Sequence, residues 1–263
     1  MSFGFNRNRA IVYLLGGLGN QLFQYGYGQC LRSHGYDVRY NSYFLQGFNG
    51  KDPLRRYGLG AFPINPISYG PWSVRLRRLC GWRLFRDQPL HSVHPLPKGP
   101  VLAVGYWQHP RYAAGIRDEV RLRLPAVEDR ARGCIALGIR RGDYVRDPSV
   151  TSSFGVLDLD YYRRALEAVP NKPVVIFTDD PAWAQTVFIP EMGLHGRATL
   201  APEADDWQTL AFMQQADHFV IANSSFHWWG AFLSGRTSVI APKAWSREQS
   251  ERCPILPESW SVR

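Results

Sequence analysis

Residues 134–143 read CIALGIRRGD, an apolar run typical of a buried β-strand that ends in two adjacent arginines. Apolar runs beginning at residues 10, 174 and 219 likewise lead into the polar motifs GGLGNQ, TDD and NSSFHWWG. In open α/β sheets ligands bind beyond the carboxyl ends of the strands, so these four motifs are expected to line one crevice. Their backbone amides, guanidiniums and hydroxyls at a helix start suit a phosphate ester.

The composition is that of a globular protein. The chain has 263 residues, of which 45% are hydrophobic and 14% aromatic, and no apolar run approaches the roughly 18 residues that span a bilayer. The first nine residues are polar and basic, unlike a signal peptide, which predicts a cytoplasmic protein. Cys30, Cys80, Cys134 and Cys253 are widely spaced, so free thiols are expected, with neither disulfides nor a zinc site.

The net charge of +9 predicts an anionic partner. Segment 75–86 interleaves aromatic and leucine side chains with five arginines: Arg75, Arg77, Arg78, Arg83 and Arg86. One interpretation is the solvated face of a helix; the other is peripheral contact with an anionic membrane. Nucleic acid is not expected, because no nucleic-acid-binding module accompanies the charge.

Strand-like and helix-like segments alternate along the chain, which predicts an α/β protein with mainly parallel strands. Helices are expected at 20–33 and 158–169. Two Rossmann-like domains, residues 1–125 and 126–263, describe the pattern most simply. The segment 42–100 shows little periodicity and is expected to hold a few short helices on long loops.

Arg140 and Arg141 point to a diphosphate, because a guanidinium donates two parallel hydrogen bonds to phosphate oxygens. Successive strand residues face opposite sides, so one arginine is expected to face the ligand. The other is expected to pair with Asp143 or to hold the loop.

The motifs after the two later strands are expected to complete this anion site. Ser224 and Ser225, which follow Asn223, begin a predicted helix whose first amides form a natural anion site. Of Asp179 and Asp180, one is expected to cap a helix and the other to accept hydrogen bonds from guanine or ribose. With two arginines to neutralise a diphosphate, no metal is expected.

The glycine loop lacks the Lys-Ser/Thr ending of a P-loop, and Leu22 occupies the third glycine position of a dinucleotide fingerprint. Asp37 lies at the spacing of a ribose-binding acid, which leaves an NAD(P)-dependent oxidoreductase or epimerase as an alternative. The amides of Asn20 and Gln21 instead suit sugar hydroxyls or a phosphate oxygen. His109 and His227 fit structural roles at least as well as catalytic ones.

Together these motifs resemble glycosyltransferase family 11, the α-1,2-fucosyltransferases, and more distantly the α-1,6- and protein O-fucosyltransferases. The matching words occur in family order: GGLGNQLFQY at 16–25, GYWQ at 105–108, IRRGDY at 139–144, FTDD at 177–180 and NSSFHWWG at 223–230. The resemblance implies a GT-B fold, two Rossmann-like domains facing a central cleft. It further implies an inverting transfer from GDP-fucose, without a cofactor or metal, to a galactose 2-hydroxyl of a glycan.

The resemblance also implies residue roles. The C-terminal domain would bind the nucleotide, with Arg140 on the diphosphate and Asp179 or Asp180 near guanine or ribose. The remaining donor contacts would come from Gly17, Gly19, Arg141, Asn223, Ser224, Ser225 and Phe226. Asn20 would reach the donor from the N-terminal domain, and Asp143 would serve as base or orienter for the incoming hydroxyl.

A bacterial form of this family would act on lipid-linked glycans such as O-antigen or lipopolysaccharide precursors. It would work in the cytoplasm, peripherally at the inner membrane. Family members usually carry histidine two residues before the first arginine, where this chain has Gly138, so that contact does not carry over. This departure leaves a non-catalytic nucleotide-sugar-binding relative as a further alternative.

Overall fold

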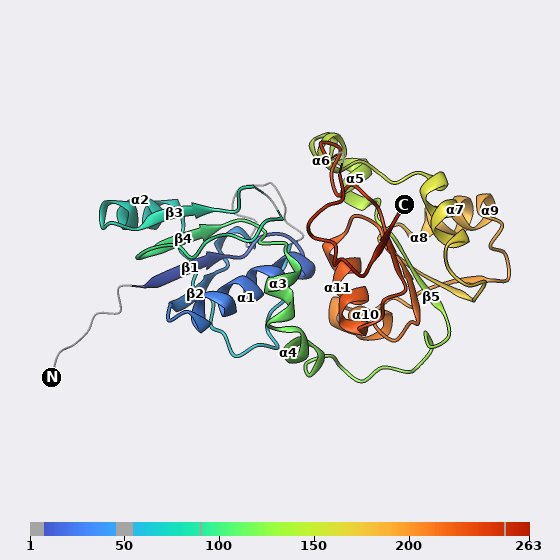
Figure 1. Cartoon of the computed structure of the whole chain (residues 1–263), viewed down its shortest axis with the longest axis horizontal. Helices are drawn as coiled ribbons and strands as arrows, with labels where there is room; N and C mark the ends of the chain where they lie inside the picture. Colours follow the sequence, from blue (N-terminus) through green and yellow to red (C-terminus); the bar gives the residue numbers. More distant parts are fainter. Residues whose placement is uncertain (1–7, 46–54, 90, 250) are drawn as a thin grey trace. The chain divides into compact units, whose positions relative to one another are not determined.

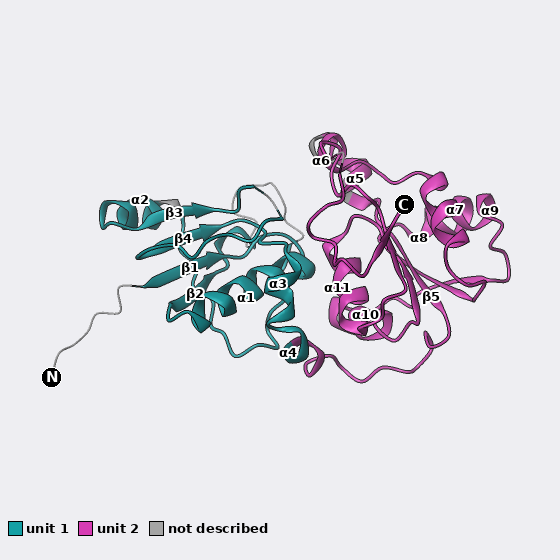
Figure 2. Cartoon of the chain, in the orientation of Figure 1, with its two compact units in different colours: residues 1–119 teal, residues 120–263 magenta. Residues whose placement is uncertain are grey.

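The computed structural model describes residues 8–45, 55–89, 91–249 and 251–263, and the side chains of Pro71, Asp143, Ser149 and Val150 lie outside this description. The chain divides into two compact units, residues 1–119 (unit 1) and 120–263 (unit 2), where the sequence placed the boundary after residue 125 (Figure 2). Each unit is an α/β structure built on its own parallel sheet, which confirms the predicted pair of Rossmann-like domains.

Unit 1 contains a four-stranded sheet in the order β2-β1-β4-β3, with every pair parallel. The strands are β1 (Arg9–Tyr13), β2 (Asp37–Asn41), β3 (Arg83–Arg86) and β4 (Val101–Val104). The described helices are α1 (Leu18–Ser33), the 3-10 turn η1 (Tyr43–Leu45), α2 (Pro71–Leu79), α3 (Pro110–Ala114) and α4 (Arg117–Arg121). Helix α1 agrees closely with the prediction for 20–33.

The arginine-rich segment 75–86 is not one helix, and its second half is a strand that the sequence pattern did not reveal. Helix α2 ends at Leu79, and Gly81 then adopts a φ of 82°, a left-handed conformation that glycine tolerates and that ends the helix. Residues 83–86 then pair with β4 as β3. The expected solvated helix face therefore covers only α2.

Unit 2 contains a six-stranded parallel sheet, of which β5 is labelled in Figure 1. The order of its strands is β10-β9-β8-β5-β6-β7. Its strands are β5 (Ile135–Ile139), β6 (Val174–Thr178), β7 (Ala198–Leu200), β8 (His218–Val220), β9 (Val239–Ala241) and β10 (Ser261–Val262). Its helices are α5 (Gly142–Arg146), α6 (Pro148–Phe154), α7 (Leu159–Glu167), α8 (Pro181–Trp183), the π-turn η2 (Ala184–Phe188), α9 (Ile189–Glu191), α10 (Asp206–Met213) and α11 (Ser225–Ser234).

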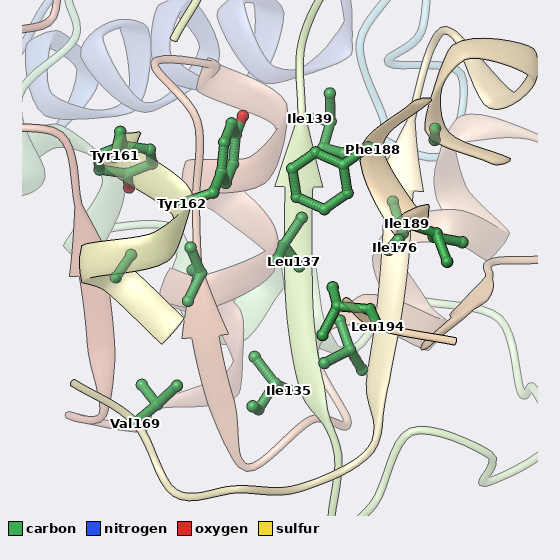
Figure 3. Close-up of a cluster of buried hydrophobic side chains, with 14 of the residues drawn as sticks. Ile135, Leu137, Ile139, Tyr161, Tyr162, Val169, Ile176, Phe188, Ile189 and Leu194 are labelled. Atoms are coloured by element: carbon green, nitrogen blue, oxygen red, sulfur yellow. The ribbon is translucent and has the colours of Figure 1, made fainter. Parts of the chain in front are cut away.

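A cluster of buried apolar side chains holds α7 and the segment from η2 to α9 against the sheet of unit 2 (Figure 3). Ile135, Leu137 and Ile139 point from β5 into this cluster, where Tyr162 and Phe188 meet them. Alternate β5 residues face the same side of the sheet, so packing these three fixes the direction in which the strand delivers Arg140.

The four cysteines are free, as predicted. No helix within the described ranges is long and apolar enough to cross a bilayer.

Candidate functional site

Three of the polar motifs lie at the carboxyl ends of neighbouring strands in unit 2. Arg140 follows β5, Asp179 follows β6, and Asn223 comes shortly after β8, and β5 lies between the other two strands. The chain runs from β5 to β6 and β7 on one side and returns for β8 on the other, which puts the topological switch point between β5 and β8. Ligands of doubly wound sheets bind at such a point. The residues after β5 and β8 therefore form the candidate donor site.

Arg140 and Asp179 form an ion pair at this edge of the sheet. Nη1 of Arg140 lies 3.0 Å from Oδ2 of Asp179, and Oδ1 accepts the backbone N–H of Arg141 at 2.8 Å. Gly142 allows this approach, because a Cβ there would lie 2.5 Å from Oδ2 of Asp179. A phosphate that binds Arg140 must therefore compete with this carboxylate.

Arg141 is held by the second aspartate. Its Nε lies 3.1 Å from Oδ2 of Asp180, and its guanidinium lies 3.8 Å from the centre of the Trp183 ring. Oδ1 of Asp180 accepts the backbone N–H of Trp183, which confirms that one residue of the aspartate pair caps a helix. The side chain of Asp143 lies outside the described residues, so its predicted role stays a prediction.

Asn223 fixes the start of α11. Its Nδ2 donates to the backbone carbonyls of Phe154 at 3.2 Å and Trp245 at 3.3 Å. The backbone carbonyl of Asn223 accepts a hydrogen bond from the Tyr144 hydroxyl at 2.9 Å. Ser224 occupies the N-cap position, but its side chain makes no capping hydrogen bond. The first amides of a helix have no partner within the helix, so α11 offers them at the switch point.

The side chains that follow Ser224 differ in exposure. Ser225 and Phe226 are half-buried, which leaves part of each side chain accessible at the start of α11. Trp228 and Trp229 are fully buried, as expected of packing residues. Ser225 and Phe226, but not the two tryptophans, are therefore placed to meet a ligand.

His227 is packed against the backbone of β5 at Gly138. A Cβ at Gly138 would lie 2.6 Å from Cγ of His227, so a side chain at this position would exclude the imidazole ring. Nδ1 of His227 is buried and has no hydrogen-bond partner among the described residues. Burial, with a smaller effect of Arg140, lowers the pKa of His227 to about 4, against the opposing effect of Asp179. The ring is therefore neutral at pH 7 and adds no positive charge beside Arg140.

In unit 1 the corresponding position is occupied by Asn20 and Gln108. Asn20 follows β1 and Gln108 follows β4, the two strands between which the winding of this sheet reverses. Nε2 of Gln108 donates to Oδ1 of Asn20 at 2.7 Å. The glycine loop positions Asn20, because Gly16 has a φ of 70° and Gly17 accepts the backbone N–H of Asn20 at 3.0 Å. Gly19 is buried inside α1.

The expectation that both amides contact a ligand is wrong for Gln21, and for Asn20 it stays a prediction. Nε2 of Gln21 donates to the carbonyls of Gly16 and Arg56, both at 2.9 Å, and Oε1 accepts the N–H of Gly58 at 2.9 Å. The side chain is fully buried. Its side-chain amide thus ties the loop that precedes α1 to the segment 56–58.

Asp87 and His94, which the sequence analysis did not single out, hold Gln108 in place. Nε2 of His94 lies 2.7 Å from Oδ1 of Asp87, and both side chains are buried. Oδ2 of Asp87 accepts the backbone N–H groups of Tyr106 at 3.1 Å and Trp107 at 2.7 Å. Trp107 has a φ of 55°, a strained backbone conformation for a bulky residue. Asp87 stabilises this turn, and the turn directs Gln108.

One signal for Asp87 was available in the sequence, because this acid follows the apolar pair Leu84-Phe85 with only Arg86 between them. The sequence analysis did not predict the strand β3, so Asp87 could not be identified as a residue at a strand end. His109, by contrast, has the structural role considered for it: its Nδ1 accepts the backbone N–H of Arg111 at 3.1 Å and caps α3. Within the described part of the chain, no three His, Cys, Asp or Glu side chains gather to hold a metal ion.

Residues 88–260 match the family described as Glycosyl transferase family 11. The chain belongs to this family. Family membership confirms the resemblance and favours a glycosyltransferase over a nicotinamide-dependent oxidoreductase. The matched region includes Asp87's partner His94 and every donor-site motif of unit 2.

Curated relatives of this chain are named as enzymes that transfer sugars. An α-1,2-colitosyltransferase of Escherichia coli is 29% identical over 95% of this chain and 97% of its own. The O-antigen biosynthesis glycosyltransferase WbnK of Escherichia coli is 26% identical over 94% of this chain and 98% of its own. Human galactoside α-(1,2)-fucosyltransferase 1 is 28% identical over 45% of this chain and 34% of its own.

Proposed function

We propose that this protein transfers fucose from GDP-fucose to the 2-hydroxyl of a galactose in a glycan, with inversion and without a metal. The observation that carries the proposal is the gathering of Arg140 and the start of α11 at the switch point of unit 2. Membership of family 11 supports glycosyl transfer. The name of the human relative supports fucose as the transferred sugar, the galactoside acceptor and the linkage.

The reaction follows from these groups. The acceptor oxygen forms a bond to C1 of fucose while the bond from C1 to the β-phosphate oxygen breaks, and GDP leaves with an additional negative charge. Arg140 and the first amides of α11 stabilise that charge, an effect worth about 3 kcal/mol per well-placed donor. Asp143 takes the proton of the acceptor hydroxyl, and Asn20 contacts the donor sugar.

GDP-colitose is the second candidate donor. A relative named as a colitosyltransferase aligns with nearly the whole chain. Colitose is fucose without the 3-hydroxyl, so both donors present the same diphosphate to Arg140. A site without a partner for the 3-hydroxyl would accept either sugar, whereas a site built to bond it would reject colitose strongly.

Transfer assays with the purified protein test this proposal. GDP-fucose and GDP-colitose are each incubated with lactose, and the products are separated by chromatography and their linkage determined by NMR. We expect a 2-O-linked product, and we expect Arg140→Ala to lose about 100-fold or more in turnover. Arg163→Ala is the matched control, because Arg163 pairs with Asp160 on the exposed face of α7. Near-normal turnover by Arg140→Ala, or GDP binding without transfer, would contradict the mechanism.

We also propose that the natural acceptor is a lipid-linked glycan in the cytoplasm, with the protein associated peripherally with the inner membrane. The name of WbnK supports this, because it assigns that relative to O-antigen biosynthesis. The net charge of +9 supports an anionic surface as a partner. Fractionation of cells that express the protein tests the association: we expect salt to release it from membranes, and recovery in the cytosol at low salt would contradict the proposal.

A further inference from the structure

Helix α2 carries apolar side chains on two opposite sides, and only one side is needed for the fold. Val74 packs on the cluster formed by Ile11, Tyr13, Trp82 and Leu102 in the sheet of unit 1. Arg77 also faces inward, with its guanidinium 4.9 Å from the centre of the Tyr69 ring and 5.1 Å from that of Trp82. These contacts attach the helix to β3 and its neighbours (Figure 1).

The other side of α2 presents large apolar side chains to solvent. Trp72 is 83% exposed, Leu76 63% and Leu79 85%. Their spacing of four and three residues puts them on one stripe of the helix, and at about 100° per residue this stripe lies opposite Val74. We call Trp72, Leu76 and Leu79 the α2 stripe. Among the residues of unit 1 that the structure describes, no packing contact explains three such exposed residues together.

The surroundings of the stripe are strongly basic. Residues 71–86, which form α2 and β3, contain five arginines and no aspartate or glutamate. Arg75 and Arg78 lie exposed on α2 itself, and Arg83 and Arg86 lie exposed on β3. The apolar stripe is thus set in a surface of one charge.

This combination fits a membrane better than a protein. A second copy of the chain would bring these arginines against each other, which is unfavourable. Three side chains also fall short of the roughly 800 Å² per partner of a stable protein interface. A bilayer interface takes a short helix with Trp and Leu on one face, and anionic headgroups attract the arginines beside it.

We propose that the α2 stripe docks unit 1 on an anionic lipid bilayer, with Trp72, Leu76 and Leu79 inserted at the interface and the flanking arginines on lipid phosphates. The inference rests on the proposed peripheral association and adds to it the surface and the lipid charge. It replaces the wider segment considered from sequence, because Trp82 is buried and Arg77 faces inward.

Vesicle co-sedimentation tests the docking surface. The full-length protein is mixed with phosphatidylcholine vesicles that contain either no anionic lipid or about 30% phosphatidylglycerol. We expect sedimentation only with the anionic vesicles and release in about 0.5 M NaCl. The variant Trp72→Ser/Leu76→Ser/Leu79→Ser is expected to lose about tenfold in partitioning, as is Arg75→Glu/Arg78→Glu.

Leu122→Ser is the control, because Leu122 is also 85% exposed but lies in unit 2. We expect it to sediment like the wild type, and we expect all variants to keep the wild-type melting temperature. If the wild type sediments and the stripe variant sediments equally, the assignment of the surface is wrong. If the wild type does not sediment, peripheral association is wrong as well. A concentration-dependent dimer that the stripe variant loses would assign the stripe to a second copy and overturn the proposal.

Transfer to soluble lactose separates this inference from the proposed reaction. The stripe variant is expected to keep wild-type turnover with that acceptor, because no stripe residue belongs to the donor site. Loss of activity by the stripe variant at an unchanged melting temperature would show that the stripe binds the acceptor rather than the membrane.

Discussion

The imidazole of His227 occupies the space that a side chain at Gly138 would fill, with Cγ of His227 2.6 Å from the position of a Cβ. These two residues belong to α11 and β5, the elements on either side of the switch point. A larger side chain at position 138 must therefore displace the ring of His227. The histidine that the family resemblance implies at position 138 would therefore collide with His227 in this structure.

Gly138→Ala should destabilise unit 2, because the buried ring must shift. We expect a loss of about 1–3 kcal/mol in the free energy of unfolding, typical of overpacking in a core. The double variant Gly138→Ala/His227→Ala should recover part of that loss, because the methyl group then has room. Urea denaturation of the two single variants and the double variant measures the coupling. Strictly additive effects would show that the two side chains do not compete for the same space.

The stability of unit 2 should fall in mild acid through His227. Its pKa of about 4 in the folded protein is lower than the ordinary 6.5, so between these values the unfolded chain binds a proton that the folded protein does not. The contribution is fully present above pH 6.5 and is lost as the pH falls to about 4, a total of about 3 kcal/mol. The difference in unfolding free energy between wild type and His227→Ala should shrink over this range. A difference that stays constant with pH would show that the ring is not held neutral.

Asp87→Asn should lower activity more than its loss of stability explains. The Asp87 carboxylate accepts two backbone N–H groups through Oδ2 and contacts His94 through Oδ1. The side chain of asparagine has only one oxygen, so it cannot keep all three contacts. The turn at Trp107 therefore loses support, and Gln108 loses its position beside Asn20. We expect a loss of about 2–4 kcal/mol in stability and a fall of about tenfold in turnover, measured well below the melting temperature.

Asp205→Ala provides the comparison for Asp87→Asn. Asp205 forms a capping box with Gln208 at the start of α10, so its loss should cost about 1 kcal/mol of stability. Turnover should stay at the wild-type level, because α10 carries none of the proposed site residues. Equal losses of activity in the two variants would assign Asp87 a purely structural role.

Asp179→Asn should increase the affinity of the site for simple anions. The side-chain carbonyl of the new amide would still accept the backbone N–H of Arg141, but the amide would no longer neutralise Arg140. Inorganic phosphate should bind about fivefold more tightly, in keeping with an ion pair that is partly exposed. The shift in melting temperature with phosphate concentration measures this affinity, and the double variant Arg140→Ala/Asp179→Asn should show none. An unchanged phosphate shift in Asp179→Asn would contradict the competition.

The strands that lead into the polar motifs could be predicted from sequence, because each combines a continuous apolar run with a polar stop. The same rule failed for β3, where Leu84 and Phe85 are only half-buried between two exposed arginines. An apolar run of two residues carries no periodicity, so only pairing with β4 reveals the strand.

Residues of the candidate site could be predicted where a charged side chain directly follows a strand, as with Arg140 and Asp179. It was not predictable where a polar side chain serves the backbone. Gln21 and Asn223 resemble ligand-binding amides in sequence, yet their donors go to main-chain carbonyls. Asp87 was missed for the converse reason, because its partners at 106 and 107 lie about twenty residues further along the chain.

The ion pair between Arg140 and Asp179 limits which anions can bind at the site. The guanidinium already has a counter-ion, so a ligand gains from it only by offering more charge or better geometry than one carboxylate does. Cellular monoanions such as acetate or chloride meet neither condition, whereas a diphosphate meets both. Selection between nucleotide sugars and abundant small anions thus begins with an exchange of partners, before any contact with the base or the sugar is made.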